Sequence, residues 1–239
     1  MGSDPLLREV RRQLSLGRLL PLGTPGDGAW VAESAAAAVL ARAVAAAPGV
    51  RGEGLRIGPA GEAFAAPDAA GAVVPPPSGL PPGPLRIEAS VAVRADRPLT
   101  DSADEVRAVL TAAAGERLGL DVAAIDVEVT ALLPDPTPGA ADPPAPPALP
   151  PGTAPDSEPG ASVAAAVLAV PGVLSLSGAL GGPSRAVEVT DDVIRVQLTI
   201  APDHRALDVA RAVSAAIARA TSPEPTRVSV LIAEIHAPE

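Results

Sequence analysis

The stretch AAAPGVR, Ala45 to Arg51, decides how this sequence is understood, because a close variant, LAVPGVL, returns at 168–174. Each phrase ends an alanine- and valine-rich run, 35–47 in the first case and 161–170 in the second. Alanine has the highest helix propensity, whereas proline ends a helix and glycine permits the left-handed turn that follows one. The phrases therefore predict the same structural event twice: an alanine-rich helix that stops and turns toward a strand.

The segments after both phrases repeat in the same order. LRIEASVAV (85–93) and IRVQLTI (194–200) alternate apolar and polar residues, which is typical of a half-buried strand. A helix follows each, and DEVRAVLTAA (104–113) aligns without gaps on DVARAVSAAI (208–217). A strand rich in valine and isoleucine closes each half. The shared order of helix, PGV, strand, helix and strand predicts an internal duplication.

Two proline-rich segments interrupt this order. Residues 58–84 contain eight prolines and residues 134–160 contain eleven, a density that excludes helix and central strand. A PxxP ligand for an SH3-like partner is the alternative to a plain spacer. No arginine or lysine flanks the PxxP of the second segment, so we interpret both segments as spacers.

We expect an α+β fold made of two small tandem units. The expected domains are a basic amphipathic arm at 1–23, a first unit at 24–133 with a proline-rich loop at 58–84, a linker at 134–160, and a second, shorter unit at 161–239. Each unit should run helix, strand, helix, strand with an extra short strand, and form a roughly three-stranded sheet covered by helices on one face. Units this small bury modest cores, so mutual packing or oligomerisation would add stability, and the sequence leaves both open.

Composition narrows the function classes. All 18 basic residues are arginine, and lysine, asparagine, cysteine and tyrosine are missing, which indicates a GC-rich bacterial genome because their codons are AT-rich or mixed. The net charge of −10 opposes binding to nucleic-acid phosphates. The lack of cysteine excludes disulfides and thiolate chemistry and fits the cytoplasm. No apolar run is long enough to cross a bilayer, so we expect a cytoplasmic protein that contacts a membrane only at its surface.

The N-terminal arm is the one functional lead outside the repeats. Residues 1–22 carry four arginines against two acidic residues, and an imperfect apolar face lies opposite the arginines. This pattern is typical of a helix on a membrane surface, and equally of a helix that docks on its own domain or on a partner. Gly17 and Pro21 limit such a helix to about three turns, which rarely persist in water without a packing surface. The candidate contact residues are Leu7, Arg8, Arg11, Arg12, Leu14 and Arg18.

The ordered unit resembles the alkaline-shock protein family, the cell-envelope-stress proteins of Gram-positive bacteria. The resemblance is carried by AAAPGVR, LRIEASVAV, SADEVRAVLTAAAGERLGL (102–120) and IDVEVTALL (125–133) in that order. It covers roughly 28–133, with a shorter copy at 161–235 that lacks the Gly-Leu turn. It implies a non-catalytic scaffold or interaction protein linked to envelope stress, which associates with a protein partner or with itself through strand edges or helix faces.

Enzyme signatures are scarce. His204 and His236 lie in different elements, and neither has the spacing of a metal motif such as HExxH. The sequence contains no phosphate-binding loop and no nucleophile elbow. We therefore expect no catalytic residue, cofactor or metal, and we expect Trp30 to fill a small core. The alternative function is a small-molecule-binding or regulatory module with its site between the two units.

Overall fold

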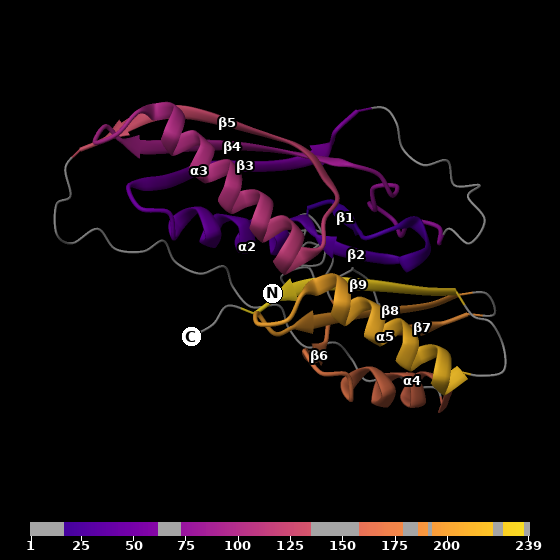
Figure 1. The fold of residues 1–239 in the computed structure, drawn as a ribbon. Helices are drawn as coiled ribbons and strands as arrows, with labels where there is room; N and C mark the ends of the chain where they lie inside the picture. The colour runs from indigo at the N-terminus through magenta and orange to yellow at the C-terminus, as the bar shows by residue number, and fades with distance from the viewer. Residues whose placement is uncertain are drawn as a thin grey trace, which may run out of the picture.

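The computed structural model describes residues 17–61, 73–134, 158–178, 186–190, 193–221 and 227–236. They form helices and two sheets, the α+β class that the sequence predicts (Figure 1). The helices are α2 (Glu33–Ala45), α3 (Leu99–Ala112), α4 (Glu158–Leu168) and α5 (Ala206–Thr221), with a 3-10 turn η1 (Pro25–Asp27) and a π-helical turn η2 (Ala113–Leu118). The strands are β1 (Leu19–Leu22), β2 (Ala29–Ala32), β3 (Val50–Pro59), β4 (Leu85–Arg94), β5 (Val122–Leu133), β6 (Val173–Leu176), β7 (Val187–Val189), β8 (Val193–Ile200) and β9 (Arg227–Ile235).

The two halves of the chain share one topology. In the first half, β3 is antiparallel to β4, and β4 is parallel to β5 with α3 between them in the chain. In the second half, β6 and β7 are both antiparallel to β8, and β8 is parallel to β9 with α5 between them. The short strands β6 and β7 together occupy the place of β3. This repeat of strand directions supports the internal duplication.

The two PGV phrases form equivalent turns. Gly49 and Gly172 have φ angles of +70° and +89°, in the left-handed region that glycine adopts without steric cost. The next residues, Val50 and Val173, begin β3 and β6. The expectation that each phrase ends a helix and turns the chain into a strand is confirmed.

The N-terminal strands belong to the sheet of the second unit, which differs from the expected arrangement. β1 is antiparallel to β2, and β2 is parallel to β9, so this sheet runs β1-β2-β9-β8-β6, with β7 also paired to β8. The expected boundary between the arm (1–23) and the first unit (24–133) therefore falls between β1 and β2, which pair with each other. The second sheet therefore has six strands instead of about three, whereas the first, β3-β4-β5, has three. Burial explains the difference, because every residue of β1 and β2 is buried and needs a sheet around it.

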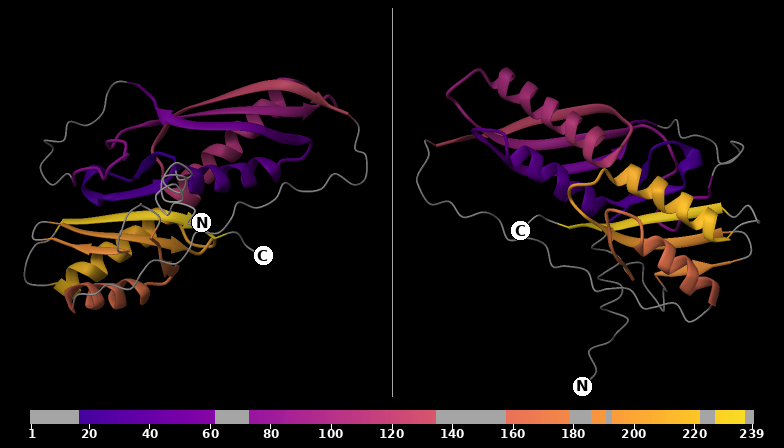
Figure 2. Two further views of the ribbon diagram at one scale, coloured as in Figure 1. Left: turned by 180° about the vertical axis from the view of Figure 1, so that it is seen from behind. Right: turned by 60° about the horizontal axis from the view of Figure 1, so that its bottom comes forward.

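The two units pack together, with α2 between their sheets (Figures 1 and 2). α2 and α3 contact the three-stranded sheet, and α4 and α5 contact the six-stranded sheet. α2 also contacts β9. Consecutive residues of β9, from Ser229 to Ala233, are buried, so both faces of the six-stranded sheet are covered there. Along β4, by contrast, Arg86 and Glu88 are exposed between buried neighbours, so one face of the three-stranded sheet is open.

Trp30 fills the core, as the sequence predicts. It is 1% exposed, and its indole N–H donates to the carbonyl of Leu80 at 3.1 Å. The amide of Leu80 donates in turn to the carbonyl of Leu19, and the amide of Leu19 donates to that of Ser78. These bonds fix residues 78–80 of the proline-rich loop against β1.

A methyl group at Gly119 should destabilise the contact between the units. Gly119 has a φ of +83°, and a Cβ there would lie 2.5 Å from the Cβ of Leu207 in α5. We expect Gly119→Ala to lower the free energy of unfolding by about 1–3 kcal/mol, because it adds backbone strain and a steric clash. Urea denaturation followed by circular dichroism measures this change.

The control for this substitution is Gly115→Ala, within the π-helical turn η2 that Gly119 follows. A Cβ at Gly115 would meet nothing within 4 Å, so the free energy of unfolding should stay the same or rise. Equal losses in the two variants would show that the turn tolerates no side chain, and the proposed clash with Leu207 would be wrong.

Candidate functional site

Arg18 is the one candidate contact residue of the arm that the structure describes. Its guanidinium donates to both carboxylate oxygens of Glu33, at 3.2 and 3.3 Å, and to the carbonyl of Ile57 at 2.6 Å. Arg18 therefore joins the start of α2 to β3 within the protein. Leu7, Arg8, Arg11, Arg12 and Leu14 lie outside the described residues.

The histidines do not form a metal centre. Within the described ranges, no group of three or more His, Asp or Glu side chains could hold a metal ion. His204 lies before α5, and its Nδ1 is 3.0 Å from Oδ1 of Asp203. This hydrogen bond is the main reason why the pKa of Asp203 lies below its usual value.

None of the described helices is long and apolar enough to span a membrane.

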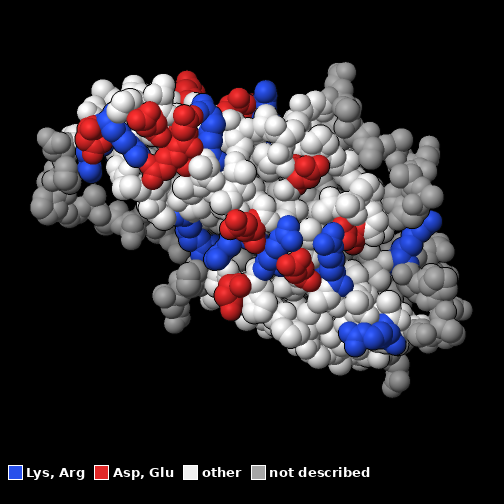
Figure 3. Space-filling view, in the orientation of Figure 1, with Lys and Arg blue, Asp and Glu red and all other residues white. Residues whose placement is uncertain are grey.

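Two arginines form reciprocal contacts across the junction between the units. Arg205, before α5, donates through Nε to the carbonyl of Gly115 in η2 at 2.9 Å. Arg117, in η2, donates through Nη2 to the carbonyl of Pro202 at 3.0 Å. Carbonyls at the end of a helix lack intrahelical partners, and the π-helical turn presents that of Gly115 to the second unit. Figure 3 shows arginine and acidic side chains gathered in a band across the middle of this face, between the units.

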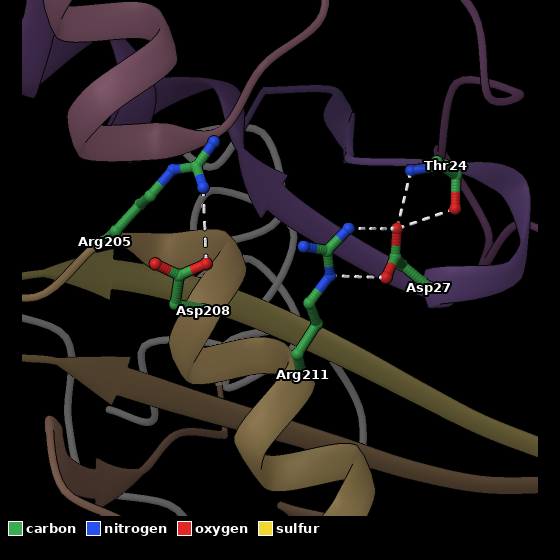
Figure 4. Close-up of polar contacts among 5 residues, drawn as sticks. All are labelled: Thr24, Asp27, Arg205, Asp208 and Arg211. Carbon is green, nitrogen blue, oxygen red and sulfur yellow. Dashed lines mark hydrogen bonds and ion pairs between the residues drawn. The ribbon is translucent and has the colours of Figure 1, made fainter.

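A further charged contact joins Arg211 of α5 to Asp27 of η1, the turn between β1 and β2 of the six-stranded sheet (Figure 4). Nε and Nη2 of Arg211 donate to Oδ1 and Oδ2 of Asp27 at 2.7 and 3.1 Å. Thr24 adds two hydrogen bonds to the same carboxylate, from its backbone N–H and its hydroxyl. The bond from Arg211 lowers the pKa of Asp27 to about 2, against the opposing effect of burial and with further help from Thr24. Asp27 therefore stays charged and bound over the physiological pH range.

A pocket of about 320 Å³ lies at the same junction. It is lined by residues of α2, of η2, of the β8–α5 loop and of the end of β9: Val39, Arg42, Ala43, Ala113, Arg117, Pro202, His204 and Ile235. The lining is apolar apart from Arg42, Arg117 and His204, and it contains no acidic residue. The pocket combines a small apolar volume with positive charge.

The open face of the three-stranded sheet is a second candidate binding surface, besides the pocket. A shallow hollow crosses its three strands, lined by segments 54–56, 88–90 and 126–128. Arg86 on β4 pairs with Asp126 on β5 at 3.1 Å. β5 forms one edge of this sheet and pairs only with β4 among the described strands. An open charged face thus adjoins a free strand edge.

Comparison of the chain with protein-family models, with curated proteins and with solved structures gave no match. The resemblance to alkaline-shock proteins therefore rests on the order and spacing of the repeated elements.

Sequence reasoning did not identify the residues of the pocket. It anticipated a site between the units only as an alternative, and it expected no catalytic or metal-binding role for His204. The pocket residues come from segments far apart in the chain, so no local motif links them. The one local signal was Arg42, a lone arginine within an alanine-rich helix.

Removing the charge of Asp27 should destabilise the fold in a pH-dependent way. The pKa of Asp27 is about 2 in the folded protein against an ordinary value of 3.8, so its ionisation stabilises the fold above about pH 4. We expect Asp27→Asn to lower the free energy of unfolding by about 1–2 kcal/mol at pH 7. The difference between variant and wild type should shrink as the pH falls from 4 toward 2, measured by urea denaturation.

Asp104→Asn is the matched control, because Asp104 forms an exposed pair with Arg107 within α3. This substitution should change stability little at any pH. A difference between Asp27→Asn and wild type that stays constant from pH 7 down to pH 2 would contradict the role of the Asp27 charge.

Proposed function

We propose that this protein is a non-catalytic interaction protein that binds an extended segment of a partner along the free edge of β5. The observation that supports the proposal is the edge itself. The register of β5 on β4 is uninterrupted from Ala124 to Val129, and no described strand pairs with the other side of β5. A strand edge presents unpaired N–H and C=O groups, which an added strand can satisfy.

The opposite edge of the sheet is less suited to strand addition. β3 carries a register shift between Gly52 and Gly54, and it ends at Pro59. Bulges and proline are features that hinder pairing at sheet edges. β5 has register shifts only on either side of Ala124–Val129 and contains no proline, so β5 is the edge at which we place the partner.

The charges of β5 indicate the chemistry of the partner. β5 contains two acidic residues, Asp126 and Glu128, and no basic one. Both point to the open face, so an added strand with arginine or lysine at alternate positions would pair with them across the strands. β5 could instead pair with β5 of a second copy, antiparallel and around a two-fold axis at Val127. Asp126 of each copy would then lie opposite Glu128 of the other, and like charges directly opposite destabilise a sheet. A basic partner is therefore favoured over self-association at this edge.

The resemblance to alkaline-shock proteins supplies the cellular part of the proposal. It supports a role in envelope stress or envelope maintenance for a cytoplasmic protein that reaches the membrane at most through its N-terminal arm. The repeated order of elements supports this part, and the absence of cysteine is consistent with it. The alternative, a small-molecule-binding module, is supported by the pocket at the junction.

A synthetic peptide of about eight residues with alternating arginine and valine tests the edge. We expect the peptide to slow amide hydrogen exchange over residues 124–129, and a glutamate–valine peptide to have no effect. The double variant Asp126→Asn, Glu128→Gln should bind the arginine peptide about threefold to tenfold more weakly, because it loses two cross-strand charge pairs.

Asp101→Asn with Asp104→Asn is the control, since it removes the same charge from α3 instead of β5. The control should bind as the wild type does. Protection at β3 instead of β5, or equal binding of both peptides, would overturn the proposal. Concentration-dependent dimerisation with protection at 124–129 in the absence of peptide would show self-association instead.

A further inference from the structure

The pocket at the junction has the composition of a binding site for a small anion. Small-molecule pockets begin at about 300 Å³ and are mostly apolar with a few polar groups that fix orientation, and this pocket fits that description at its lower limit. Two of its three polar residues are arginines. They come from α2 and η2, two elements of the first unit, and His204 comes from the second.

Arg42 is the residue that the rest of the fold does not explain. Its Nε donates to the carbonyl of Ala38 in its own helix at 3.3 Å. Its Nη1 is buried and has no hydrogen-bond partner among the described residues. A buried guanidinium N–H without a partner costs free energy, and proteins usually keep such a group only where something binds it. An anion in the pocket would supply the missing acceptor.

Arg117 and His204 lie nearer to solvent. Arg117 is exposed, and its bond to the carbonyl of Pro202 occupies only Nη2. His204 is held by Asp203, which is itself not part of the lining. The guanidinium fork of Arg117 thus keeps donors for a ligand.

The apolar lining determines the chemistry of the part of the ligand beyond its anionic group. Val39 and Ala43 come from α2, and Pro202 and Ile235 come from the second unit. Inorganic anions would leave these surfaces unused, whereas a short hydrocarbon chain would cover them. The lining therefore favours an anion that carries an apolar chain.

We propose that the pocket between the units binds a short-chain carboxylate, with its carboxylate on Arg42 and Arg117 and its chain against Val39, Pro202 and Ile235. Because the lining comes from both units, the ligand would hold them together and link small-molecule binding to the stability of the junction. The inference is independent of the proposed function, since the β5 edge contributes no residue to the pocket.

Hexanoate, its neutral analogue hexanamide and inorganic phosphate are the probes, at constant ionic strength. We expect hexanoate to bind the full-length protein with a dissociation constant in about the millimolar range, measured by calorimetry and by a rise in melting temperature. Hexanamide lacks the charge and phosphate lacks the chain, so both should bind at least about tenfold more weakly. Hexanoate should also slow amide exchange in both α2 and residues 201–205.

Arg42→Met separates a binding role from a structural one. Methionine keeps most of the apolar stem but removes the unpaired N–H, so the free protein should be as stable as wild type or more stable. Hexanoate binding should fall about tenfold to a hundredfold. Arg107→Met, an exposed arginine of α3, should leave binding unchanged.

Three results would overturn the proposal. Hexanamide or phosphate that binds as tightly as hexanoate would reject a carboxylate with an apolar chain. Slowed exchange in only one unit would reject a ligand held between the two. A large loss of stability in Arg42→Met without ligand, with hexanoate binding unchanged, would give Arg42 a purely structural role. None of these results bears on peptide binding at β5.

Discussion

The parallel pairing of β2 with β9 is the constraint on which the rest of the structure depends. α2 begins at Glu33, directly after β2 ends at Ala32, so this pairing fixes the helix between the two sheets. A helix that is covered on two sides leaves space mainly for small side chains. Seven of the thirteen residues of α2 are alanine. Helix propensity explains why alanine forms this helix, and packing between two sheets explains why few larger residues occur in it.

The two copies of the unit diverge in the contacts that the aligned charged residues of α3 and α5 form. Asp104 and Arg107 of α3 pair with each other, whereas the aligned residues of α5, Asp208 and Arg211, do not. Arg211 binds Asp27 in η1, the turn between β1 and β2 of the six-stranded sheet, and Asp208 pairs with Arg205. The same residues at the same helical spacing thus form a local surface pair in one copy, whereas in the other the arginine binds the N-terminal strand pair. The difference arises because α5 faces η1, and such a partly buried contact stabilises more than an exposed pair.

The sequence predicted the parts of the fold that have local signals. Alternation identified β4 and β8, and the PGV phrases identified the helix ends. β3 lacked a clear signal because Gly52, Gly54 and Gly58 interrupt its alternation. β1 and β2 are four residues each, too short for a period, and the partner of β2 lies at the far end of the chain. The pocket also depends on segments far apart in the chain, so the sequence offered only a site between the units as an alternative, without its residues.

The charges on the open sheet oppose the packing of a further unit against it. The face of the six-stranded sheet next to α2 includes Gln197, Thr199 and Ser229, which are small or uncharged and buried. The equivalent face of the three-stranded sheet carries the Arg86–Asp126 pair and two further carboxylates. Burial of these charges under another alanine-rich helix would cost more solvation free energy than their pairing returns. A partner at the edge of β5 leaves them in water, so the same charges that block further stacking are compatible with strand addition.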